Sequence, residues 1–269
     1  MTHLQPSASA TPAPRVFLSA RWQALAMLNY EIDPGILRPL VPCGTELDTH
    51  DGKTYVSLVG FLFLRTRVLG LAIPFHANFE EVNLRFYVRR EVGGELRRGV
   101  VFIKEIVPRW AIARTARLAY NEPYLALPMS HHVAGPVRLH VVQSAGWIPR
   151  EDSTAAGSQG VEYRWRFQGR WNSLALRHEG RPAQLVAGSH AEFIAEHYWG
   201  YCGQRDGSTV EYQVQHPPWQ VWRGLEPRLD CDAGALYGPQ FAPVLGHPPA
   251  TAFLADGSAI AVLRPTRIA

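Results

Sequence analysis

The sequence contains few cysteines and few lysines. Its three cysteines, Cys43, Cys202 and Cys231, lie far apart, and no C-x-x-C pair occurs. A sparse, odd set of cysteines is typical of free thiols in a reducing compartment, so we expect a cytoplasmic protein. Lysine occurs only at Lys53 and Lys104, and arginine supplies most of the positive charge behind the net charge of +4. Because the arginines are scattered, we expect no nucleic-acid binding.

Long apolar runs are also missing. No run of about 18 apolar residues is present to span a membrane, and we expect no membrane association. Residues 1–14 lack a charged start and an apolar signal core. Serine, alanine, threonine and proline dominate this segment, which predicts a disordered tail ahead of one domain over residues 15–269.

The common motifs of metal sites, nucleophilic catalysis and phosphate binding do not occur. H-E-x-x-H, G-x-S-x-G and the phosphate loop are all absent. The densest histidine set is His131, His132 and His140, but adjacent histidines on a strand point to opposite faces. We therefore expect neither a metal site nor a cofactor.

The clearest pattern in the chain is a hairpin with one apolar and one polar face. Residues 81–89 alternate strictly between polar and apolar side chains, which is the period of a β-strand. Gly93-Gly94 then provides a two-residue turn, because glycine tolerates positive φ. A second β-rich run, Val100 to Ile106, completes the predicted hairpin.

Folding the two strands about this turn predicts a register. Phe86 faces Val101 on the apolar side, whereas Asn83 faces Lys104 on the polar side. The polar side then gathers five side chains: Glu81, Asn83, Arg85, Tyr87 and Lys104. Two interpretations remain open. The cluster is either the wet face of an antiparallel sheet or part of a barrel lumen, where a carboxylate beside cations forms a binding or acid-base site.

The remaining segments predict mainly strands with short peripheral helices. The run 54–64 is apolar on both faces, which indicates a central strand. Asp33-Pro34 begins one helix, and Ser189 with Glu192 forms a capping box at the start of another. We expect strands over 16–30, 54–64, 137–144, 161–167, 171–176 and 209–215, helices over 34–40, 109–120 and 191–199, and a hairpin at Asp256-Gly257.

Three side chains have open chemical roles. Lys104 becomes a nucleophile if burial or a neighbouring cation lowers its pKa, and an enclosed Glu81 can act as an acid or a base. Glu196-His197 forms an acid-base pair only if the fold brings it to a pocket. Otherwise this run is a helix end whose Tyr198 and Trp199 pack into the core.

Several stretches resemble the bacterial domain of unknown function 2071 family. They are ARWQALAMLNYEIDPGILRPLVP, YVSLVGFLF, NFEEVNLRFYVRRE, GVVFIKEIVPR and EHYWGY, and the likeness runs from about Phe17 to Pro265. That family is similar in fold to the acetoacetate decarboxylase superfamily. The resemblance implies a mostly antiparallel β-barrel or cone with a central cavity and a few helices.

The resemblance also implies which residues line the cavity. In the decarboxylases an arginine of the first strand and glutamates do so, and Arg21 and Glu81 look like the corresponding positions. The place of the Schiff-base lysine is occupied here by residues 121–125, with Tyr124 nearest. A decarboxylase without its amine cannot form the iminium that its reaction needs.

We therefore predict a mainly β (α+β) domain, an antiparallel barrel or cone. The candidate catalytic residues are Glu81 and Lys104, and the candidate ligand-binding residues are Arg21, Asn83, Arg85, Tyr87 and Tyr124. Three functions are compatible with the sequence. They are binding of a small carboxylate or carbonyl metabolite, Glu-centred acid-base chemistry on a small organic acid, and protein interaction through the aromatic run Tyr198 to Tyr201. The sequence does not determine the oligomeric state.

Overall fold

A computed structural model describes residues 15–74, 76–108, 123–134 and 159–268. The expected tail over 1–14, the helix over 109–120 and the strand over 137–144 lie outside these ranges. The helical segments are α1 (Pro34–Leu37), η1 (Arg38–Leu40), α3 (His190–Ala195), α4 (Ala233–Tyr237), η2 (Pro239–Phe241) and α5 (Ala242–Leu245). The strands are β1 (Val16–Ile32), β2 (Glu46–Leu47), β3 (Thr54–Val68), β4 (Leu71–Ala72), β5 (Phe79–Val92), β6 (Glu95–Val107), β7 (Tyr124–Ala126), β8 (Met129–Ala134), β9 (Gly160–Phe167), β10 (Arg170–His178), β11 (Ala183–Gln184), β12 (Trp199–Gly203), β13 (Thr209–Gln215), β14 (Gln220–Asp230), β15 (Thr251–Ala255), β16 (Ala259–Leu263) and β17 (Thr266–Ile268).

The long strands β1, β3 and β5 form the antiparallel centre of the fold. β3 pairs with β1 on one side and with β5 on the other, and nearly all of its residues are buried. This is the central strand that the apolar run 54–64 predicted. Asp33 caps α1 by accepting a hydrogen bond from the Gly35 backbone, as its position before Pro34 indicated.

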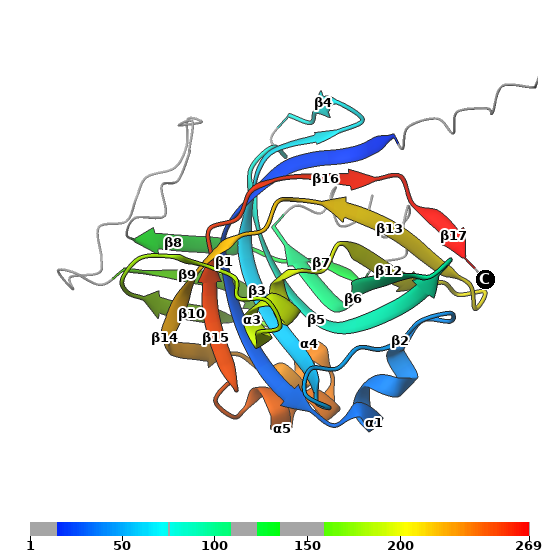
Figure 1. Ribbon diagram of the computed structural model, residues 1–269. Coiled ribbons are helices and arrows are strands. Elements are labelled where there is room, and N and C mark those ends of the chain that lie inside the picture. The colour runs from blue at the N-terminus through cyan, green and yellow to red at the C-terminus, as the bar shows by residue number, and fades with distance from the viewer. Residues whose placement is uncertain (1–14, 75, 109–122, 135–158, 269) are drawn as a thin grey trace, which may run out of the picture.

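Strand pairing closes this centre into a ring. β5 pairs with β6, β6 with β12, β12 with β13, β13 with β16, and β16 returns to β1. The β6–β12 pairing is parallel, whereas the others are antiparallel. Figure 1 shows these strands surrounding a common interior. The expected mainly β, barrel-like architecture is therefore confirmed, and one face of each ring strand is turned inward.

A second layer packs against the outer face of the ring. β15 continues from β1 to β14, and β14 leads through β10 and β9 to β8. The fully buried Tyr163 and Trp165 of β9 join the cluster that also contains Leu58 and Leu84 of the ring. Each central strand thus has two buried faces, one toward this layer and one toward the ring interior.

The register predicted for the β5–β6 hairpin is correct only near its turn. Phe86 pairs with Val101 as expected, but a bulge follows, and Leu84 pairs with Lys104. A single extra residue in one strand turns every later side chain to the opposite face. Lys104 therefore faces the same side as the second layer, where its Nζ donates to the carbonyl of Leu236 in α4 at 2.6 Å. Its predicted place opposite Asn83 is taken by Glu105.

Two further expectations are wrong. Asp256-Gly257 is not a hairpin, because β15 and β16 do not pair with each other but follow one another along β1. The expected helix over 191–199 ends at Ala195, and Trp199 begins β12. The N-cap of this helix is as predicted, with Ser189 accepting a hydrogen bond from the Glu192 backbone at 3.2 Å.

Gly60 of β3 tests the packing of the second layer on the ring. A Cβ atom at this position would lie 2.5 Å from the Tyr163 ring, whose hydroxyl donates to the Ala24 carbonyl at 2.7 Å. Because that ring is held on both sides, we expect Gly60→Ala to lower the free energy of unfolding by about 1–3 kcal/mol. Denaturant unfolding measures the change.

Gly203→Ala is the control, because nothing lies within 4 Å of the Cβ atom that it adds. Equal stability of the Gly60 variant and the wild type would contradict the packing described here.

Candidate functional site

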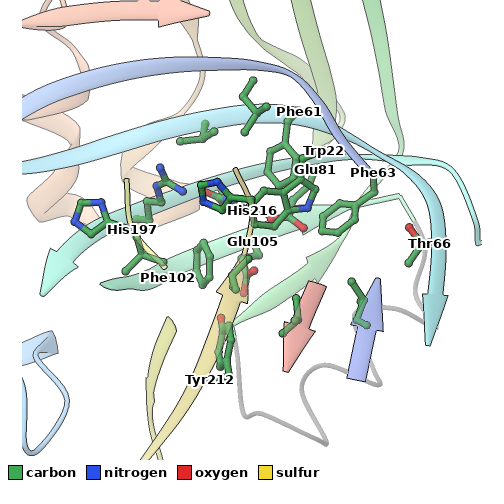
Figure 2. Close-up of a pocket in the computed structure, with 18 of the residues that line it drawn as sticks. Trp22, Phe61, Phe63, Thr66, Glu81, Phe102, Glu105, His197, Tyr212 and His216 are labelled. Carbon is green, nitrogen blue, oxygen red and sulfur yellow. Dashed lines mark hydrogen bonds between the residues drawn. The ribbon is translucent and has the colours of Figure 1, made fainter. Parts of the chain in front are cut away.

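The ring encloses a cavity of about 220 Å³. Every strand of the ring contributes to its wall, and α3 reaches it through Ala195. Figure 2 shows His197 and Thr66 at opposite ends of the lining, with Glu81 and His216 between them. Side chains from distant parts of the chain therefore meet in one enclosed space.

Aromatic rings form one continuous side of this cavity. The Trp22 ring lies 5.3 Å from Phe61 and 6.1 Å from Trp219, between ring centroids. Phe63 stacks on Phe79 at 4.8 Å. A bulge at Ala24, which has a φ of 56°, keeps Trp22 and Leu25 on the same inner face. This side can accept the apolar body of a ligand and exclude water from it.

Strand β5 adds polar groups beside the aromatic side, with Glu81 paired directly with Phe61 of β3. Glu81, Asn83 and Arg85 line the cavity with exposed fractions of 2%, 1% and 8%. The Asn83 amide donates to one Glu81 oxygen at 2.9 Å, and the Tyr124 hydroxyl donates to the other at 3.5 Å. The alternation of β5 predicted that these residues share one face, and of the two interpretations left open the structure shows the enclosed one. Glu105 joins them from β6 and is 2% exposed.

Arg85 is the cation in this group. One of its Nη atoms donates to the carbonyl of Ile194 at 3.2 Å, and its guanidinium lies 5.7 Å from the centre of the Tyr87 ring. Among the described residues it has no ion pair, and its buried Nε has no hydrogen-bond partner. A guanidinium with remaining donors in an enclosed, mostly apolar cavity is suited to a carboxylate.

Two uncharged histidines complete the polar part of the wall. Burial lowers the pKa of His197 well below its ordinary value, and the charges of Arg85 and Arg98 lower it further. Burial also lowers the pKa of His216, whose ring stacks on Trp219 at 4.2 Å. Both rings are therefore neutral near pH 7. The sequence left His197 open between an acid-base role and a helix end, and the fold brings it to the cavity.

The structure separates the other predicted site residues from the cavity. Arg21 lies on the face of β1 opposite Trp22, since successive side chains of a strand alternate. Tyr87 shares a face with Arg85 but is not part of the wall, because α3 covers it and its hydroxyl pairs with Ser57 at 2.6 Å. Lys104 also faces away from the cavity. The prediction that Arg21, Tyr87 and Lys104 line the cavity is therefore wrong.

Sequence reasoning also missed several wall residues. Glu105 could not be found without the bulge, which no local pattern signals. Trp22 was assigned no role. It follows Arg21 directly on a strand, so only one of the two side chains can face inward, and it is Trp22 that lines the cavity. The run Tyr198 to Tyr201 does not form an exposed surface, because Tyr201 is 1% exposed and only Tyr198 and Trp199 are partly accessible.

The cavity contains no lysine. The chain has only Lys53 and Lys104. Lys53 forms an exposed ion pair with Glu31 at 2.8 Å, and Lys104 faces the same side as the second layer. In the described ranges no group of three or more His, Cys, Asp and Glu side chains is arranged to hold a metal ion. Nor does any helix in those ranges have the length and apolar character needed to span a bilayer.

Residues 19–259 match the sequence pattern of a family described as an uncharacterized conserved protein, domain of unknown function 2071. Among curated proteins, the chain is similar to the uncharacterized protein YqjF of Bacillus subtilis, with 41% identity over 69 residues. That segment is 25% of this chain and spans 28% of the length of YqjF.

Solved structures with a similar fold include enzymes. Acetoacetate decarboxylase from Legionella pneumophila matches with a TM-score of 0.64 and 14% identity, over 97% of this chain and 93% of that one. The enduracididine biosynthesis enzyme MppR, complexed with pyruvate, matches with a TM-score of 0.60 and 14% identity, over 98% and 93% of the two chains. An acetoacetate decarboxylase-like enzyme from Sphingomonas wittichii matches with a TM-score of 0.58 and 17% identity, over 99% and 98%. At these identities the likeness shows the fold alone, and it confirms the expected fold.

The neutral state of His197 predicts a pH dependence of stability. The unfolded chain binds a proton on this histidine below about pH 6.5, whereas the folded protein does not. Because the unfolded state then binds more protons, the free energy of unfolding falls as pH drops below about 6.5. We expect His197→Gln to lose stability less steeply than the wild type between about pH 6.5 and 5.

Denaturant unfolding at several pH values compares the slopes. His247→Gln is the control, because His247 is exposed. A His197 variant with the wild-type slope would contradict the assignment of a buried neutral imidazole.

Proposed function

The chain belongs to the domain of unknown function 2071 family of conserved proteins, and we propose that it binds a small carboxylate-bearing molecule in the cavity of its ring. Arg85 pairs with the carboxylate, and the aromatic side holds the apolar body of the ligand. A ligand with a carbonyl oxygen in place of the carboxylate accepts hydrogen bonds from the same Arg85 donors, but these bonds are weaker because the oxygen carries no full charge.

The observation that carries this proposal is the burial of Arg85 without a carboxylate partner among the described residues. A buried charge is costly unless it is paired, and among the described residues Arg85 has a backbone carbonyl but no carboxylate partner. An anionic ligand provides the missing charge. The apolar surroundings then strengthen the pairing, because the effective dielectric constant is low there.

A structural relative supports a small acid as the ligand. MppR, which has a similar fold, has a structure in complex with pyruvate. The cavity of this chain is larger than pyruvate requires and is mostly apolar, so phenylpyruvate is the complementary probe.

The proposal predicts ligand-dependent stabilisation. Pyruvate or phenylpyruvate raises the Tm of the wild type in a saturable way, since a ligand at 100 times its Kd stabilises the folded state by about 2.7 kcal/mol. We expect Arg85→Gln to weaken binding about 10-fold to 100-fold, the loss typical of a charged hydrogen bond. Thermal-shift titration and calorimetry measure both effects.

Arg89→Gln is the matched control. Arg89 is on the same strand but forms an exposed ion pair with Glu46 at 2.8 Å, outside the cavity. Equal loss of affinity in both variants, or no response of the wild type to any acid, would contradict the proposal.

A second candidate function is acid-base catalysis on such an acid. It is favoured by the two carboxyl groups, Glu81 and Glu105, that reach the cavity from neighbouring strands. The Glu81 side chain is held by Asn83 and Tyr124, so its position is defined. A carboxylate near a bound oxo acid can remove a proton from the carbon beside the carbonyl and return one from solvent.

This candidate function predicts hydrogen–deuterium exchange on the ligand without a covalent intermediate between ligand and protein. In D2O, the protein is expected to catalyse exchange of the methyl protons of pyruvate for deuterium, and NMR measures the rate of this exchange. Glu81→Gln should reduce the rate at least 100-fold. Borohydride added during the reaction traps no adduct by mass spectrometry, because neither lysine lines the cavity. A stoichiometric adduct on Lys104 would exclude this mechanism, and exchange that is unchanged in Glu81→Gln would exclude Glu81.

A further inference from the structure

His197 and Arg85 are neighbours in the cavity wall, although one follows α3 and the other lies on β5. Both contact Tyr87: the His197 ring centre lies 4.6 Å from the Tyr87 ring centre, and the Arg85 guanidinium lies 5.7 Å from it. They are 7% and 8% exposed, respectively. A group that pairs with Arg85 is therefore placed beside the imidazole of His197.

The two cations around His197 differ in their own partners. Arg98, on β6, donates to both oxygens of the buried Asp48, at 2.8 and 3.4 Å. Asp48 also accepts from the Thr49 backbone and lies 4.0 Å from His197, beyond hydrogen-bond distance. Arg98 thus has a fixed carboxylate partner whether or not the cavity is occupied, although its charge still lowers the pKa of His197. Arg85 has no such carboxylate among the described residues, so its charge acts on His197 directly.

The other groups that face His197 do not compensate this charge. The Phe193 ring of α3 lies 5.6 Å away and is apolar. Tyr87 shares its hydroxyl with Ser57, and His216, which follows β13, is neutral because burial lowers its pKa. Neither ring nitrogen of His197 has a hydrogen-bond partner of normal geometry among the described residues, although the backbone of Ile194 lies close enough to raise its pKa and so partly oppose the effect of burial. The imidazole is therefore a buried polar group whose state depends on what occupies the cavity.

We propose that His197 takes up a proton when a carboxylate binds to Arg85, and that the resulting imidazolium donates a second hydrogen bond to the ligand. The inference rests on the proposed function and adds a residue that selects ligands by charge. No covalent bond changes, and the proton comes from solvent. A carboxylate gains two cationic contacts in this way, whereas a neutral carbonyl compound contacts Arg85 without cancelling its charge and leaves His197 uncharged.

The direction of the effect follows from charge balance. In the free protein, burial and Arg85 hold the pKa of His197 well below its ordinary value. A bound carboxylate cancels the repulsion from Arg85 and adds an attraction, so the pKa rises on binding. Protons are taken up at pH values between the free and the bound pKa, and by linkage the affinity for the anion falls as pH rises through the bound pKa.

Calorimetry tests this coupling. Phenylpyruvate and pyruvate are titrated into the full-length protein near pH 6, in two carboxylate-free buffers with different ionisation enthalpies. The expected result is a binding enthalpy that depends on the buffer and corresponds to uptake of up to about one proton per ligand. The Kd of the wild type also increases with pH, by up to about tenfold per pH unit.

Two variants identify the group that is protonated. His197→Gln keeps a donor and His197→Phe keeps the ring packing on Tyr87, and both should bind with no proton uptake and with a Kd that does not vary with pH. His190→Gln, which alters a half-buried histidine outside the cavity wall, should retain the wild-type uptake.

Binding without buffer dependence in the wild type, or uptake that persists in both His197 variants, would overturn the inference and leave the proposed function intact. Failure of the wild type to bind either acid would contradict the proposed function, and this inference with it.

Discussion

Closure of the strand ring is the constraint on which the rest of the structure depends. The pairing of β13 with β16, and of β16 with β1, leaves the inner faces of the strands with no access to bulk solvent except through the cavity. Polar residues on an open sheet would be hydrated. On this closed sheet Glu81, Asn83 and Arg85 are almost fully buried, so their charges and hydrogen bonds must be satisfied by one another, by the backbone or by a ligand.

The second layer makes the same strands rigid. Because Tyr163 and its neighbours pack on the outer face of β3 and β5, these strands cannot turn their polar residues outward without exposing an apolar core. The two faces of β5 therefore have separate tasks. One face packs into the apolar core, and the other holds a small set of ionisable groups in fixed positions in a cavity whose wall also contains aromatic rings.

The fold is shared with acetoacetate decarboxylase-like proteins, but the chemistry of the cavity is not determined by the fold. Neither lysine of this chain lines the cavity, so an iminium intermediate on a lysine is not available. What the wall offers instead is a guanidinium, two carboxyl groups and two neutral histidines around an apolar space. The chemistry of these groups suits pairing with an anion and transfer of a proton, and both proposals use these properties.

The sequence alone determined the strands of the centre, the shared face of Glu81, Asn83 and Arg85, the caps of α1 and α3, and the family with its fold, because alternation, turn residues and specific motifs are local signals. Whether that face was solvated or enclosed was left open. Only the tertiary structure decided which of these groups meet. A one-residue bulge moved Lys104 out and Glu105 in, and closure of the ring brought His197 to Arg85 across more than a hundred residues of chain. Bulges and closure depend on pairing between distant strands, and no local pattern in the sequence records that pairing.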